Sequence, residues 1–154
     1  MASVSEQFSG TWLLESWTAQ DEFGHVERQF GDQPRGVLII TPDGWLSMQL
    51  AASSRADLAS GSGPLGGPAE HSAAFLTYAA YVGRCRVEGD RLTTTVQVGL
   101  IPGWVGSEQV RGVVLDDGLL VLRARPRRAR QPGIRAGQLV LPATGRVMGQ
   151  ARVA

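Results

Sequence analysis

Residues 36–50 read GVLIITPDGWLSMQL, two short runs rich in apolar residues on either side of one turn signal. The turn signal is Pro42-Asp43-Gly44, in which proline presets φ and glycine supplies a positive φ. The run before it, residues 36–41, is rich in β-branched apolar side chains, which favour a strand. The stretch therefore predicts a β-hairpin with strands at 36–41 and 45–50.

Turn signals recur at short intervals along the rest of the chain, each between two apolar or alternating runs. The expected strands are residues 12–19, 25–30, 36–41, 45–50, 82–88, 91–100, 107–115, 119–125 and 138–141. Eight or nine strands with mostly short connections are enough to close an up-and-down barrel, and closure leaves no exposed sheet edge. We therefore predict an all-β fold, a single closed antiparallel up-and-down β-barrel of about eight strands formed by residues 1–154.

Three segments interrupt this pattern. Residues 51–68 are rich in Ser, Gly, Ala and Pro and predict a long mobile loop. Residues 69–80 predict one short helix, because Pro68 stands near its start, where a missing N–H is harmless. Residues 126–137 predict a loop with four arginines. We interpret this loop as solvated, because the alternative, contact with RNA or anionic lipid, has no interleaved aromatic residue to support it.

The composition narrows the chemistry. A hydrophobic fraction of 43% with a net charge of +1 indicates a globular protein that no overall charge steers toward nucleic acid or a membrane. All fifteen basic residues are arginines, so a lysine Schiff base is excluded, and two histidines cannot form a three-histidine metal site. We expect no metal and no cofactor. Because Cys85 is the lone cysteine and no signal peptide or membrane-spanning run is recognisable, the cytoplasm is the expected location.

Several stretches resemble a known family. They are Gly10-Thr11-Trp12, residues 34–47 (PRGVLIITPDGWLS), residues 78–84 (YAAYVGR), residues 102–106 (PGWVG) and residues 108–111 (EQVR). Over Gly10 to about Leu122 the chain is similar to the bacterial lipocalin-like domain family, and it departs from the family pattern at Ile40 and in the closing strand. The resemblance implies an eight-stranded barrel, open at one end, with a ligand cavity. The resemblance is also compatible with a polyketide cyclase, since some small barrels of lipocalin-like shape serve as cyclases.

Alternate side chains of a strand face the same side, so each expected strand has an inner and an outer set. The inner sets are mostly aliphatic and aromatic with a few hydroxyls, which is the lining expected for an apolar ligand. The residues predicted to bind it are Trp12, Leu14, Trp45, Met48, Val96, Val98, Trp104, Leu120 and Leu122. Trp104 stands out, because it lies between strands, where a large aromatic side chain has less core to fill. For each aromatic residue the alternative is plain core packing.

Three polar side chains are candidates for catalysis, namely Tyr78, Tyr81 and Arg111. The two tyrosines could donate hydrogen bonds to a carbonyl, and Arg111 could anchor a carboxylate, an enolate or a carbonyl. The alternative for Arg111 is an outward, solvated side chain. We interpret His71 as a solvated helix residue and Cys85 as a small buried hydrophobe, since no base partner for the thiol is recognisable.

These features predict a hydrophobic small molecule as the partner, under two hypotheses. In the first, a cofactor-independent cyclase of bacterial secondary metabolism folds a linear polyene or polyketide-derived substrate into a near-attack shape for a cycloaddition. The lack of a recognisable acid–base constellation favours it, because a pericyclic step needs no proton relay. In the second, the protein binds or carries a hydrophobic metabolite without turnover. A structural or interaction module would instead need a filled barrel. A homodimer is compatible with a small barrel, and nothing in the sequence decides the oligomeric state.

Overall fold

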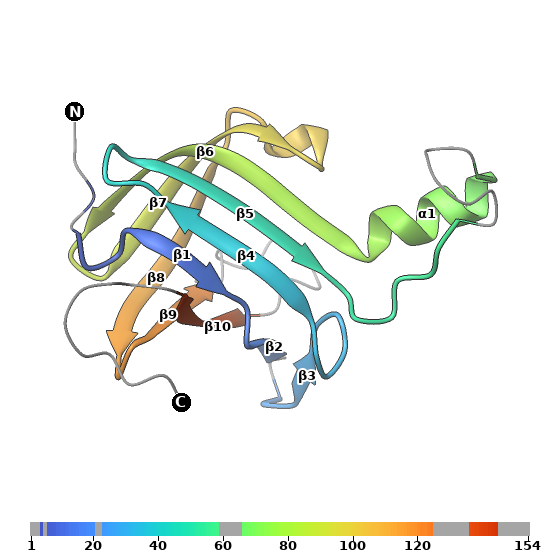
Figure 1. Ribbon diagram of the computed structural model, residues 1–154, viewed down its shortest axis with the longest axis horizontal. Helices are drawn as coiled ribbons and strands as arrows, with labels where there is room; N and C mark the ends of the chain where they lie inside the picture. Colours follow the sequence, from blue (N-terminus) through green and yellow to red (C-terminus); the bar gives the residue numbers. More distant parts are fainter. Residues whose placement is uncertain (1–3, 5, 21–22, 59–65, 125–135, 145–154) are drawn as a thin grey trace.

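The computed structural model describes residues 4, 6–20, 23–58, 66–124 and 136–144, and these form ten strands, one α-helix and one 3-10 helix (Figure 1). The strands are β1 (Gly10–Leu13), β2 (Ser16–Gln20), β3 (Val26–Arg28), β4 (Arg35–Ile40), β5 (Trp45–Ala51), β6 (Tyr78–Glu88), β7 (Arg91–Gly99), β8 (Glu108–Asp116), β9 (Leu119–Ala124) and β10 (Ala136–Thr144). The helices are α1 (Pro68–Leu76) and the 3-10 helix η1 (Pro102–Trp104).

Eight strands close into a ring. Strands β4 to β10 pair in sequence order, and β1 pairs with β4 on one side and with β10 on the other. All of these pairings are antiparallel. After a short interruption β2 follows β1, and the β2–β3 hairpin adds to β10. The prediction of a closed, lipocalin-like antiparallel β-barrel with one short helix is therefore confirmed.

The two ends of the barrel differ. At the end that we call the N-terminal end, Val4 and Phe8 are buried in the core, and the Trp12 indole nitrogen Nε1 donates a hydrogen bond to the Phe8 carbonyl at 3.1 Å. The opposite end, which we call the η1 end, carries η1 and the base of α1 (Figure 1). The helix α1 projects away from the barrel and contains no buried side chain.

Three predicted segment bounds need correction. The predicted helix 69–80 ends at Leu76, because Tyr78 already pairs with Ala51 as the first residue of β6. The predicted loop 51–68 is shorter, since its first residue belongs to β5 and its last to α1, and residues 59–65 lie outside the described residues. Of the predicted basic loop 126–137, residues 126–135 also lie outside them, whereas 136–137 begin β10.

The register of the strands places one continuous apolar cluster inside the ring. Leu38, Met48 and Tyr81 are directly paired across β4, β5 and β6, and all three are buried. The same alternation continues through β9, where Leu120 and Leu122 are buried and Arg123, the residue after Leu122, is exposed. Inner and outer faces can therefore be assigned strand by strand from the pairing.

A β-bulge changes this alternation between β6 and β7. Val82 pairs with Val98, but the next residue, Gly83, pairs with Val96, so Gln97 is the extra residue. Because one inserted residue reverses the inward and outward positions beyond it, Val96 is buried whereas Val98 is 67% exposed. The prediction that Val98 faces the interior is therefore wrong.

Gly83 is the residue that makes this bulge possible. A Cβ atom at position 83 would overlap the backbone carbonyl oxygen of Thr95. Gly83→Ala should therefore lower the free energy of unfolding by about 3 kcal/mol, the upper end for overpacking a core. The measurement is urea unfolding followed by far-UV circular dichroism.

Gly103→Ala is the matched control, because nothing lies within 4 Å of a Cβ at that exposed position. Its free energy of unfolding should equal that of the unchanged protein. Equal stability of both variants would show that the close approach at Gly83 is not a constraint on the barrel.

Candidate functional site

Most of the predicted ligand-binding residues lie on the inner side of the barrel. Trp12, Val96, Leu120 and Leu122 are at most 2% exposed, and Leu14 and Met48 are also buried. A side chain that lined an open cavity would keep some accessible surface. These four side chains keep almost none, so neighbouring atoms cover them. A ligand that leaves the core packing intact therefore has to contact the inner residues that keep some accessible area.

Two predicted site residues, Tyr78 and Trp45, lie on the outer face of the barrel, away from the interior in which the ligand was expected. Tyr78 precedes the inner residue Ala79, and its hydroxyl donates a hydrogen bond to the Gln49 side-chain oxygen Oε1. Trp45 precedes the inner residue Leu46, and the guanidinium carbon of Arg84 lies 4.6 Å from the centre of its ring. Strand alternation explains both, because each is one position away from a core residue.

Tyr81 and Trp104 form an aromatic pair at the η1 end of the interior. Their ring centres are 6.0 Å apart and their planes meet at 85°, an edge-to-face arrangement. Tyr81 is buried on β6, whereas Trp104 is half-buried in η1 and packs against the core. The turn that carries Trp104 is fixed by hydrogen bonds from the Ser107 hydroxyl to the Trp104 carbonyl and from the Gly106 N–H to the Val96 carbonyl.

The Tyr81 phenol is held in its neutral form. Burial raises its pKa above the ordinary value, the positive charge of Arg111 acts in the opposite direction, and nearby Cys85 adds a smaller raising effect. A tyrosine whose pKa is raised stays protonated at neutral pH. Tyr81 can therefore donate a hydrogen bond to a carbonyl, but it is not a base at this pH.

Arg111 lies on the inner wall, as the functional interpretation of the sequence requires. On β8 it pairs with Leu92, a core residue of β7, and directly opposed residues project to the same face. The side chain is half-buried, and its Nη1 donates a hydrogen bond to the Val110 carbonyl at 3.2 Å.

The neighbours of Arg111 on β8 divide between the two faces. Gln109, two residues earlier, shares the inner face, and its side-chain nitrogen Nε2 lies 3.4 Å from the Ser107 hydroxyl oxygen. Glu108 lies on the outer face, where Arg86 contacts its carboxylate at 3.2 Å. The sequence left the orientation of both residues open, and strand pairing assigns it.

Trp17 is an interior aromatic residue that the sequence pattern did not predict. Trp17 packs against the core and meets Phe30 edge to face, with ring centres 4.8 Å apart. The sequence predicts one continuous strand 12–19 with Ser16 inward, but the chain is interrupted between β1 and β2. The interruption shifts the alternation, so that Trp17 takes the core position.

The Cys85 thiol shows no sign of being a nucleophile. It is buried on the inner face of β6, and burial raises its pKa to about 11. The thiolate is the reactive form of cysteine, and a pKa this high leaves very little of it at neutral pH. Cys85 therefore acts as a small buried hydrophobe, in agreement with its interpretation from the sequence.

Metal coordination and membrane crossing by a helix find no support in the described residues. Among the residues that the structure describes, no cluster of three or more His, Cys, Asp or Glu side chains could hold a metal ion. His71 is exposed on α1. The described part of the chain also contains no helix of the length and apolarity needed to cross a membrane.

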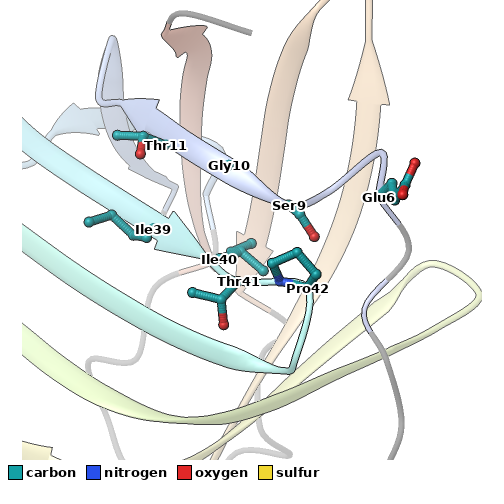
Figure 2. Close-up of a pocket in the computed structure, with 8 residues that line it drawn as sticks. All are labelled: Glu6, Ser9, Gly10, Thr11, Ile39, Ile40, Thr41 and Pro42. Carbon is teal, nitrogen blue, oxygen red and sulfur yellow. The ribbon is translucent and has the colours of Figure 1, made fainter. Parts of the chain in front are cut away.

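A groove of about 520 Å³ lies on the outside of the barrel, near its N-terminal end. Figure 2 shows Glu6 and Ser9 from the N-terminal segment and Thr41 and Pro42 from the turn after β4. Ile39, which also lines it, is 42% exposed on the outer face of β4. The groove contains none of the predicted site residues.

Comparison with known proteins places this barrel in a family. A crystal structure of an uncharacterized protein from Bacteroides eggerthii DSM 20697 is 14% identical in sequence, with a TM-score of 0.44, over 89% of this chain and 99% of the other. No curated protein matches the chain. The profile of the lipocalin-like domain family matches residues 9–141, which is most of the sequence. The chain therefore belongs to the lipocalin-like domain family.

Proposed function

We propose that the protein binds an apolar small molecule in the barrel interior, at the η1 end, against Trp104 and Tyr81. A lipocalin-like barrel is suited in general to holding a ligand. Two observations carry the proposal, the aromatic pair at the η1 end and the two polar side chains, Arg111 and Gln109, on the otherwise apolar inner face of β8. Binding sites for small molecules combine these two features, apolar contact area and a few polar groups that fix orientation.

The distribution of burial supports the η1 end as the location. Trp12 and Leu120, which lie away from η1, are covered by neighbouring atoms. Trp104, which lies in η1 itself, keeps part of its surface accessible. A ligand that covers about 100 Å² of exposed apolar surface gains roughly 2.5 kcal/mol from that contact. The indole of Trp104 offers such a surface and a flat face for a ring or a conjugated chain.

This proposal predicts different effects for two Trp→Ala substitutions. The neutral fluorescent probe N-phenyl-1-naphthylamine should bind saturably, and Trp104→Ala should raise its dissociation constant at least about fivefold, because the aromatic wall is lost. Trp45→Ala should leave the dissociation constant unchanged, since Trp45 lies outside under Arg84. The measurement is a fluorescence titration of each protein.

Circular dichroism melts show whether both variants retain the fold of the unchanged protein. Equal weakening by the two substitutions would place the probe elsewhere. No saturable binding to the unchanged protein would remove the proposed function.

Cyclisation of a linear polyene is the second candidate function, and the placement of Tyr81 favours it. A neutral phenol and the Arg111 guanidinium on one apolar wall can both donate hydrogen bonds to a carbonyl, which makes an attached double bond a better partner for a diene. In such a cycloaddition two carbon–carbon σ bonds replace two π bonds, and no atom is lost. The barrel would supply the folded shape of the substrate, which lowers the entropic part of the barrier.

Two Tyr→Phe substitutions distinguish the cyclase from a carrier. Linear substrates with a diene and a carbonyl-conjugated alkene should cyclise faster with the protein than without it. Tyr81→Phe should reduce this rate about tenfold, because one hydrogen bond to the carbonyl is lost. Tyr78→Phe, on the outer face, should not change the rate.

Chromatography of the reaction mixture over time gives the rates. Saturable binding of the substrates with no acceleration would contradict the cyclase and leave the carrier. Equal rates for the two variants would contradict the role of the Tyr81 hydroxyl.

A further inference from the structure

Arg111 carries the one charge on the inner face of the ring strands β4 to β9, whose side chains the structure describes. The other inner residues of β4 to β9 are apolar or uncharged, including its partner in the pairing, Leu92. Strand β10 completes the ring, and its sequence AGQLVLPAT contains no charged residue. A single positive charge therefore faces an apolar interior.

Among the described residues of β4 to β9, no acidic side chain shares the inner face with Arg111. Glu108, the acidic residue of β8 closest in sequence, lies on the outer face with Arg86. Asp117 is the last acidic residue of the whole sequence, so nothing that follows it supplies a carboxylate side chain. The described hydrogen bond of the Arg111 guanidinium is the one to the Val110 carbonyl. A guanidinium has five N–H donors, so several remain for a ligand.

Leaving a charge in an apolar, partly buried place is unfavourable unless an opposite charge joins it. The guanidinium matches a carboxylate especially well, because two parallel N–H donors can meet the two oxygens. Two neutral groups, the Tyr81 hydroxyl and the Gln109 amide, are on the same inner wall and can donate further hydrogen bonds to an oxygen-rich end of a ligand.

We propose that the ligand of the barrel is an amphipathic oxyanion, an apolar chain or ring system that ends in a carboxylate or enolate bound by Arg111. This inference rests on the proposed function and specifies its ligand class. The apolar part of the ligand contacts Trp104 and Tyr81, and the oxyanion pairs with the guanidinium. Tyr81 on β6 and Arg111 on β8 both lie on the inner face of the barrel.

The test uses a matched pair of fluorescent polyenes, cis-parinaric acid and its methyl ester, at pH 7.5. The two share the apolar chain and differ in the negative charge. The unchanged protein should bind the acid at least about tenfold more tightly than the ester, the gain expected for a charge-assisted hydrogen bond. Arg111→Gln should remove this preference by weakening the acid and should leave the ester unaffected.

Arg123→Gln is the matched control, because Arg123 is exposed on the outer face of the neighbouring strand β9. It should retain the full preference for the acid. Arg111→Lys keeps the charge and should also retain a preference, which provides a second test if Arg111→Gln does not fold.

Equal binding of the acid and the ester by the unchanged protein would overturn the inference and leave the proposed function intact. The inference would also be overturned if Arg111→Gln kept the preference for the acid. The same holds if Arg123→Gln removed this preference as completely as Arg111→Gln does. Failure of both probes to bind would instead overturn the proposed function. The inference about the ligand class, which rests on that function, would then also be wrong.

Discussion

Hydrogen bonds on both sides of β1 close the barrel, and this closure determines which side chains meet inside it. Because β1 pairs with β4 and with β10, each strand of the ring has one face inside and one outside. Because the barrel is closed, side chains on part of its inner wall are closely packed. A Cβ atom at Gly36 would lie 2.6 Å from the Leu50 side chain and 3.0 Å from that of Leu14. The wall around Gly36 is therefore filled.

The chemistry of the site depends on how the apolar interior of the barrel changes the protonation of the few polar groups inside it. Burial keeps the Tyr81 phenol and the Cys85 thiol protonated, so neither is a base or a nucleophile at neutral pH. Arg111 keeps its charge, because a guanidinium does not lose its proton in proteins. The described inner face of β4 to β9 therefore offers hydrogen-bond donors and one positive charge. This set suits recognition of an oxyanion or polarisation of a carbonyl better than hydrolysis, which needs an activated nucleophile.

The sequence predicts the strands well and the facing of individual residues less well. Hairpins such as the one around Pro42-Asp43-Gly44 depend on local turn chemistry, so their positions agree with the structure. The predicted inward position of Tyr81 also agrees, because β6 is regular there. The predicted inward position of Val98 is wrong because of the β-bulge between β6 and β7. The core position of Trp17 was not predicted because the chain is interrupted between β1 and β2. Both features arise from pairing with distant strands, which a local pattern does not contain.

Indole N–H signals in a two-dimensional ¹H–¹⁵N NMR spectrum test the interior location of the ligand most directly. Trp104 lies at the η1 end of the interior, Trp12 at the N-terminal end and Trp45 on the outer face, so the three report on separate places. Titration with cis-parinaric acid should shift the Trp104 signal in a saturable manner and leave those of Trp12 and Trp45 in place. A saturable shift of Trp45 without a change at Trp104 would contradict ligand binding inside the barrel.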